Sequence, residues 1–194
     1  MNAPLILAFD TTGPHCAAAL LSGETILEAR VKDMARGQAE NLMGLLEGLL
    51  ADHQKHWGDV TALAVGVGPG NFTGIRISVS AARGLALGLG IPAMGVSLFD
   101  TTQRLSGRAQ TGVPAPRDQM YVFDPDKAPA PVLTTAQSDQ AIATSTEHSV
   151  ADHVSTMAFI AKERAQGQVA PPKPLYVRAP DAAPARDAPP RILP

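Results

Sequence analysis

Glycine and proline occupy different parts of this 194-residue chain, and this division constrains its fold more than any other feature. Sixteen of the 17 glycines lie at or before Gly112, whereas 13 of the 17 prolines lie at or after Pro114. Glycine permits tight turns and close backbone approach, and proline imposes stiff, extended connections. We therefore expect an N-terminal lobe in residues 1–106, a reduced C-terminal lobe in residues 107–170 and a Pro-rich tail in residues 171–194.

The composition excludes several classes of protein. Hydrophobic residues make up 45% of the chain, which rules out disorder of the whole, and a formal charge of −2 argues against a general nucleic-acid binder. The single cysteine, Cys16, allows no internal disulfide and no cysteine zinc site. No apolar run approaches the roughly 20 residues that span a bilayer, and the N-terminus lacks a basic segment. We expect a cytoplasmic protein with no membrane contact.

Hydrophobic periodicity predicts an α/β fold. Apolar runs and turn signals predict strands at residues 5–9, 15–21, 25–31, 60–67 and 91–96, and helical spacing predicts helices at 38–50, 75–89 and 98–105. Three antiparallel strands followed by helix, strand and helix form a mixed sheet flanked by helices. The later part has a weaker signal, with strands expected at 120–123 and 132–134 and a helix at 150–165.

Asp10, Thr11 and Thr12 follow the first apolar run directly. A carboxylate and two hydroxyls at the end of a buried strand can meet a phosphate or a hydrated metal ion. The alternative is a turn that these side chains cap by bonding their own backbone. The sequence leaves both interpretations open.

A glycine-rich loop joins the expected strand at 60–67 to the next helix. It consists of Gly68, Pro69, Gly70, Asn71, Phe72, Thr73 and Gly74. Free backbone N–H groups at such a helix start favour anions, but the glycines also let strand and helix pack closely. Arg76 lies in the first helical turn, against the preference of the helix dipole for acids there, so it has either a specific partner or a plain exposed position.

Other catalytic motifs are absent. The loop has no Walker lysine, because no lysine occurs between Lys55 and Lys127, and Thr73 stands where a Rossmann motif needs glycine. No G-x-S-x-G elbow is present. We interpret two histidine pairs, His53 with His56 and His148 with His153, as solvated helix ends, and Cys16 as a small core residue.

Three motifs together resemble the bacterial TsaB (YeaZ) family of tRNA threonylcarbamoyladenosine biosynthesis proteins. The first is Asp10-Thr11-Thr12 with the loop that runs on to Ile75 and Arg76, where the family usually has Ser for Asn71 and Leu for Ile75. The second is the segment 36–42, with Gln38 in place of the usual His. The third is Pro174-Leu175-Tyr176-Val177-Arg178, which is similar to the family's closing strand and is the part of the tail expected to be ordered.

The resemblance implies the actin/heat-shock-chaperone/sugar-kinase fold, with two related lobes of mixed sheet and helices and a trimmed second lobe. It also implies a non-catalytic subunit that pairs with the catalytic paralogue TsaD and with the ATPase TsaE. That complex transfers threonylcarbamoyl to adenosine 37 of tRNAs that read codons beginning with adenosine. The chain would thus reach tRNA through the complex.

The residues agree with an accessory role. An enzyme of this fold needs a glycine-rich adenosine loop in its second lobe, and after Gly112 only Gly167 remains. The metal-binding His-x-x-x-His pair of the catalytic paralogue is also missing. We therefore expect no cofactor on the isolated chain, with ATP and metal on the partner subunits, and we interpret Asp10, Thr11 and Thr12 as a vestigial cofactor site.

A scaffold needs a partner surface, and the helices at 38–50 and 73–89 are the candidates. We expect the contact residues to be Leu42, Met43, Leu46, Arg76 and Arg83. In the family such helices mediate both pairing with TsaD and self-pairing, so a homodimer is expected when the partner is absent. Two other functions remain open: a stand-alone nucleotide-binding ATPase and a glycoprotease-like peptidase.

Overall fold

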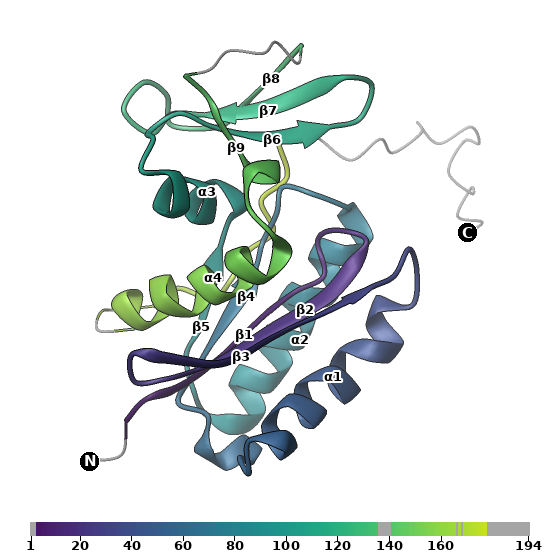
Figure 1. The fold of residues 1–194 in the computed structure, drawn as a ribbon, viewed down its shortest axis with the longest axis vertical. Coiled ribbons are helices and arrows are strands. Elements are labelled where there is room, and N and C mark those ends of the chain that lie inside the picture. The colour runs from purple at the N-terminus through teal and green to yellow at the C-terminus, as the bar shows by residue number, and fades with distance from the viewer. Residues whose placement is uncertain (1–2, 136–140, 166, 168, 178–194) are drawn as a thin grey trace, which may run out of the picture.

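The computed structural model describes residues 3–135, 141–165, 167 and 169–177. Its larger sheet has five strands in the order β3-β2-β1-β4-β5. The strands are β1 (Leu5–Asp10), β2 (His15–Ser22), β3 (Thr25–Asp33), β4 (Ala62–Gly66) and β5 (Ala93–Val96). The first three pair antiparallel, and β4 and β5 continue the sheet in parallel with β1 (Figure 1). The mixed sheet expected from the sequence is confirmed.

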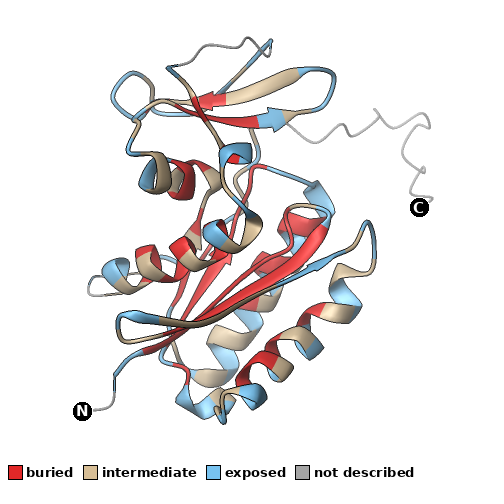
Figure 2. Ribbon diagram, in the orientation of Figure 1, coloured by how far each residue is buried: buried red, intermediate tan, exposed pale blue. Residues whose placement is uncertain are grey.

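Helices cover both faces of this sheet. On one face lie α1 (Gln38–Asp52) and α2 (Phe72–Leu89), and on the other lies α4 (Val150–Arg164) (Figure 1). Each face has its own core, in which β1, β2 and β4 bury nearly every side chain, whereas the edge strand β3 is half-buried or exposed (Figure 2). The sheet is therefore the middle of three layers, and its alternate residues pack against different helices.

The helix α1 corrects part of the expected partner surface. Leu42 and Leu46 are 2% and 0% exposed, because both side chains pack into the core between α1 and the sheet. They cannot form a contact surface, so this part of the interface prediction is wrong. Met43 is 37% exposed on the outer side of the same helix and remains available.

The smaller sheet has four strands in the order β8-β7-β6-β9. They are β6 (Thr111–Ala115), β7 (Gln119–Phe123), β8 (Val132–Thr135) and β9 (Ala143–Thr144). The sequence did not indicate β6, which contains Pro114, or β9, which has only two residues. Between the two sheets run α3 (Leu98–Ser106) and the short 3₁₀ turn η2 (Ser145–Glu147); a second such turn, η1 (Trp57–Asp59), precedes β4. Although α4 falls in the range 107–170, it packs against the larger sheet.

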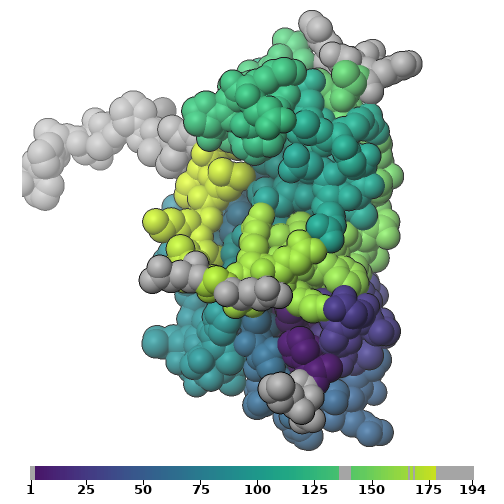
Figure 3. Space-filling model, turned by 90° about the vertical axis from the view of Figure 1, so that its left-hand side faces the viewer, coloured from purple at the N-terminus to yellow at the C-terminus, as the bar shows by residue number. Residues whose placement is uncertain are grey.

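Residues 169–177 run along the edge of the larger sheet, beside β5 and one side of α2; they form the yellow surface band in Figure 3. The backbone N–H of Leu175 donates to the Val67 carbonyl at 2.8 Å. Arg83 Nε donates to the Pro172 carbonyl at 2.9 Å. The ordering expected around Leu175-Tyr176-Val177 agrees with these contacts. Arg178 and the rest of the tail lie outside the described residues.

Cys16 is a core residue, as expected. Its side chain is fully buried in β2 and donates to the Gln38 carbonyl at 3.4 Å. Burial raises the pKa of the Cys16 thiol, which disfavours the reactive thiolate. No helix in the described part of the chain is both long enough and apolar enough to cross a membrane.

Candidate functional site

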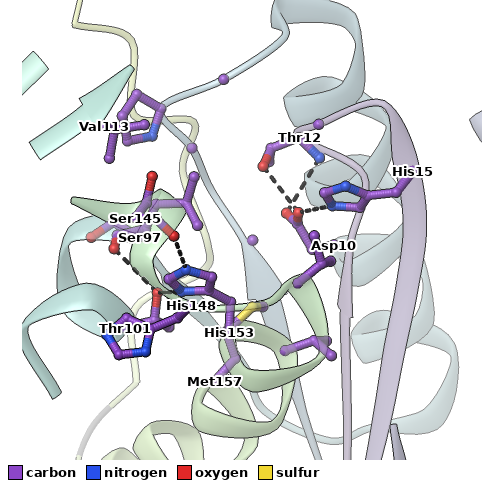
Figure 4. A pocket seen from close by; sticks show the side chains of 18 of the residues that line it. Asp10, Thr12, His15, Ser97, Thr101, Val113, Ser145, His148, His153 and Met157 are labelled. Atoms are coloured by element: carbon purple, nitrogen blue, oxygen red, sulfur yellow. Dashed lines mark hydrogen bonds and ion pairs between the residues drawn. The ribbon is translucent and has the colours of Figure 1, made fainter. Parts of the chain in front are cut away.

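A cavity of about 380 Å³ lies between the ends of the larger sheet and the smaller sheet. Its walls come from the β1–β2 turn, the glycine loop after β4, the start of α3, β6, η2 and α4. In the close-up view, Asp10, Thr12 and His15 occupy one wall, and Ser97, Thr101, Ser145, His148 and His153 occupy the other (Figure 4). Segments more than 100 residues apart in the sequence therefore share one site.

Asp10 is the centre of the first wall. It sits at the carboxyl end of β1 and is 7% exposed. Its Oδ2 accepts hydrogen bonds from the Thr12 hydroxyl at 3.0 Å and from His15 Nε2 at 2.8 Å, and its Oδ1 accepts from the Thr12 backbone N–H at 3.3 Å. The sequence identified Asp10 and Thr12 but missed His15. The signal was available, because β2 begins at His15 and pairs with β1, which brings the imidazole beside Asp10.

Thr11 does not belong to the cavity. Its side chain is fully buried, and its hydroxyl donates to the Gly74 carbonyl at 2.7 Å. Thr11 is absent from the described cavity lining. The prediction that Thr11 helps to bind a cofactor is therefore wrong. Its hydroxyl links the end of β1 to the first turn of α2 by a hydrogen bond.

The glycine loop packs closely against residues 11 and 12. The Asn71 backbone N–H donates to the Thr12 carbonyl at 2.7 Å, and the Asn71 side chain accepts from the Gly74 N–H at 3.0 Å as the cap of α2. A Cβ atom added at Gly70 would lie 2.4 Å from the Thr12 carbonyl oxygen, and one at Gly74 would lie 1.9 Å from that of Thr11. This geometry favours the packing alternative over an anion cradle, since these two N–H groups are already bonded.

The two halves of the glycine loop lie in different surroundings. Gly68, Pro69 and Gly70 line the cavity, whereas Phe72 and Thr73 are exposed at the start of α2. Arg76 is also exposed and takes no part in the cavity lining. Its guanidinium lies 3.9 Å from the centre of the Phe72 ring.

Arg76 also bonds the returning C-terminal segment. Its Nε donates to the Tyr176 hydroxyl at 3.1 Å, and the rings of Phe72 and Tyr176 are 4.8 Å apart. Part of the apparent conflict with the helix dipole is thus explained within the chain, because Arg76 joins the start of α2 to residues 169–177.

His153 is a buried residue of the second wall, so the prediction that it lies at a solvated helix end is wrong. It is 7% exposed in α4, with Nε2 2.8 Å from the Ser145 carbonyl and Nδ1 2.7 Å from the Thr101 hydroxyl. A carbonyl can only accept, so Nε2 carries a proton and donates it to Ser145. Burial lowers the pKa of His153, against the pull of the Ser145 carbonyl, and nearby His148 lowers it further. The surroundings therefore disfavour the positively charged form of this ring.

We expect the stability of the chain to fall on mild acidification because of His153. A buried imidazole with a lowered pKa binds its proton more weakly in the folded state, so the unfolded state takes up a proton first below the ordinary value of 6.5. Stability is fully present above that pH and is lost as the pH falls towards the folded pKa. One proton gives a slope of up to about 1.4 kcal/mol per pH unit. Urea unfolding between about pH 7.5 and pH 5.5 measures this slope.

Two variants test whether His153 causes this dependence of stability on pH. His153→Gln keeps hydrogen-bonding groups but removes the titration, so its slope should be shallower than that of the unsubstituted chain. His56→Gln changes a side chain that is 89% exposed, so its slope should be unchanged. Equal slopes in all three proteins would contradict the assignment.

The cavity does not fit a magnesium nucleotide. Its described lining contains no lysine or arginine, which polyphosphates require. Asp10 Oδ2 already accepts two hydrogen bonds, and no cluster of three or more histidine, cysteine or acidic side chains suited to a metal occurs in the described ranges.

Comparison with known proteins assigns the family. The sequence model of the TsaD family, described as tRNA N6-adenosine threonylcarbamoyltransferase, matches residues 32–111. The TsaB protein of Escherichia coli K12 is 38% identical over 96 residues, which cover 50% of this chain and 41% of the relative. An uncharacterized protein of Mycobacterium tuberculosis H37Rv is 30% identical over 198 residues, covering 92% of this chain and 94% of the relative. The chain belongs to the TsaB/YeaZ family.

Other family members agree. TsaB of Bacillus subtilis is 32% identical over 121 residues, covering 60% of this chain and 52% of the relative. The matched part therefore spans about half the length of these named TsaB proteins. The crystal structure of YeaZ from Pseudomonas aeruginosa superposes with a TM-score of 0.65 at 24% identity, covering 86% of this chain and 95% of that one, which supports the TsaB/YeaZ fold.

Proposed function

We propose that this TsaB/YeaZ-family chain is a non-catalytic subunit in the biosynthesis of threonylcarbamoyladenosine in tRNA. The observation that carries the proposal is the match of its N-terminal part to proteins whose names assign them to that pathway. The chain would pair with a TsaD-like catalytic paralogue and act with a TsaE-like ATPase. The target would be adenosine 37 of tRNAs that read codons beginning with adenosine, and the ATP and metal would belong to the partner subunits.

The outer face of α1 and α2 supports a pairing role. Both helices lie on the same side of the larger sheet (Figure 1), and residues 169–177 bond to one edge of α2 through Arg76 and Arg83. Met43 on α1 is 37% exposed and Leu87 on α2 is 87% exposed. Exposed Gly44 and Gly84 leave room for a partner helix to approach closely. A second helix pair on this face would complete a four-helix arrangement and bury both apolar side chains.

The charges on this face are complementary between the helices. α1 exposes Glu40 and Glu47, whereas α2 exposes Arg76 and Arg83. A second copy turned by a two-fold axis could set one copy's acidic helix against the other's basic helix. The same face would serve TsaD, so the homodimer and the heterodimer should compete.

The test is co-purification of the chain with the TsaD paralogue of its own organism, followed by light scattering. We expect a 1:1 complex that Met43→Glu and Leu87→Glu each weaken by about tenfold or more, because each variant buries a charge at the contact. Val132→Glu is the matched control, since Val132 is 56% exposed but lies on β8, in the other sheet.

Two outcomes would reject the proposal. A complex that tolerates both helix substitutions would reject this face, and the absence of a complex under all nucleotide and tRNA conditions would reject the role. Nucleoside mass spectrometry of tRNA from cells depleted of the chain tests the pathway separately, and undiminished threonylcarbamoyladenosine would exclude it. The ATPase and peptidase alternatives gain no support from the cavity, whose described lining has no cation for a polyphosphate.

A further inference from the structure

The cavity between the two sheets has the size and lining of a small-molecule site. Its volume of about 380 Å³ lies within the range of ligand pockets, about 300–1,000 Å³. Much of its surface is apolar, with Val96 and Leu98 from the larger-sheet side, Val113 from β6 and Met157 from α4. An apolar body of one ring would fit within such a space.

The charge of the lining selects the kind of ligand. Apart from the histidines, the charged side chains among the described lining residues are Asp10 and Asp33, and both are acidic. A low-dielectric cavity with carboxylates and no lysine or arginine attracts a cation and repels an anion. Burial lowers the pKa of His153, which disfavours an offsetting positive charge on that ring.

Asp10 retains a free acceptor site. Its Oδ2 accepts from Thr12 and His15, but among the residues that the structure describes its Oδ1 accepts one bond, from the Thr12 N–H at 3.3 Å. The space beside Oδ1 depends on Gly66, where a Cβ atom would lie 1.8 Å from that oxygen. A carboxylate oxygen accepts more than one hydrogen bond, so Oδ1 can take a further donor.

On the opposite wall, one buried nitrogen lacks a hydrogen-bond partner among the described residues. His148 lines the cavity, and its buried Nε2 has no hydrogen-bond partner within the described ranges. A buried polar atom without a partner is unfavourable, and sites that bind ligands are where such atoms are tolerated. A polar group of a ligand beside this ring would lower the cost.

We propose that the cavity binds a small primary amine, with its ammonium group beside Asp10 Oδ1 and its apolar body against Val96, Val113 and Met157. The ammonium supplies a further N–H donor for Oδ1 and a positive charge, which no lysine or arginine supplies among the described lining residues. The inference concerns the isolated chain and does not depend on the proposed TsaD partner.

The test compares three probes of nearly equal shape and different charge at pH 8: benzylamine, benzyl alcohol and phenylacetate. Binding is followed by the amide shifts of the ¹⁵N-labelled full chain. We expect benzylamine to bind in the millimolar range, as eight heavy atoms allow, and about tenfold more tightly than benzyl alcohol. Phenylacetate should bind more weakly still. The shifted amides should include those of residues 10–15 and 145–153.

The variant Asp10→Asn assigns the preference to the carboxylate. It keeps the size and acceptor oxygen of the side chain, and it should bring benzylamine and benzyl alcohol to similar affinity. Asp59→Asn is the matched control, because Asp59 lies in η1 and is absent from the described cavity lining, so its amine preference should be unchanged. The charge series on the unsubstituted chain remains decisive if Asp10→Asn does not fold.

Three results would overturn the inference: no saturable shift up to about 20 mM benzylamine, equal binding of the three probes, or tighter binding of magnesium ATP in the same cavity. None of these would bear on pairing with TsaD, which is measured by light scattering of the mixture. Failure of the amine site and failure of the proposed function can therefore be told apart.

Discussion

Gly74→Ala is expected to destabilise the fold by about 3 kcal/mol or more, although alanine is the better helix former. The added Cβ would lie 1.9 Å from the Thr11 carbonyl oxygen and 3.0 Å from its carbon. Backbone atoms cannot turn away as a side chain can, so the end of β1 and the start of α2 must separate. That movement would also break the hydrogen bond from Thr11 to Gly74. Urea unfolding followed by circular dichroism measures the loss.

Gly84→Ala is the matched control on the same helix. Gly84 is exposed, and a Cβ there would meet nothing within 4 Å. The substitution should raise the free energy of unfolding by about 0.5–1 kcal/mol, the ordinary gain from replacing glycine in a helix. If both variants changed stability in the same direction, close packing at Gly74 would not be the reason for its glycine.

Leu46→Ala should cost about 3–5 kcal/mol of unfolding free energy, the second largest effect that we expect. Leu46 is 0% exposed and packs with Leu42, Leu49 and the strands of the larger sheet. Removing its three outer carbons would leave a cavity that the sheet cannot close. The same denaturant measurement detects it, and a loss below about 1 kcal/mol would mean that α1 is not packed as described.

Met43→Ala supplies the comparison within α1. Its side chain is 37% exposed, so truncation should change stability by less than about 1 kcal/mol. This contrast also decides how interface variants are interpreted. A charge at position 46 would disrupt pairing by unfolding the chain, whereas a charge at position 43 or at Leu87 tests the surface itself.

The local pattern predicted most of the larger sheet and its helices. The spacing of Leu42, Leu46, Leu49 and Leu50 predicted α1, because side chains at these intervals share one face of a helix. The same pattern did not tell Leu46 from Met43. Both lie on one broad apolar stripe, and only the angle at which α1 rests on the sheet decides which side chain faces outward.

The smaller sheet was predicted less well because its strands are short and weakly patterned. Gly112 and Pro114 in β6 interrupt the usual strand signal, and β9 consists of Ala143 and Thr144 alone. These strands form by pairing with each other, and Ala143 and Thr144 pair with β6 in parallel over two residues. No local propensity encodes such a contact.

The sequence predicted only part of the candidate site. Asp10 and Thr12 were recognised because they follow a buried strand, and the sheet does bring them to a cavity. Their neighbour His15 was treated only as the start of a strand. His153 was missed because its partners, Thr101 and Ser145, lie 52 and eight residues away and belong to other elements.

The sequence by itself determined the elements of this protein, its glycine loop and its family, since hydrophobic periodicity and glycine positions act through local backbone geometry. Only the tertiary structure decided that the loop packs against Thr11 and Thr12, that Leu46 is core, and that Asp10 and His153 share a cavity. The physical reason is that these contacts join residues far apart in the sequence, such as Thr11 and Gly74, which are 63 positions apart. They exist only when both layers of helices are packed on the sheet, and no short stretch of sequence contains that information.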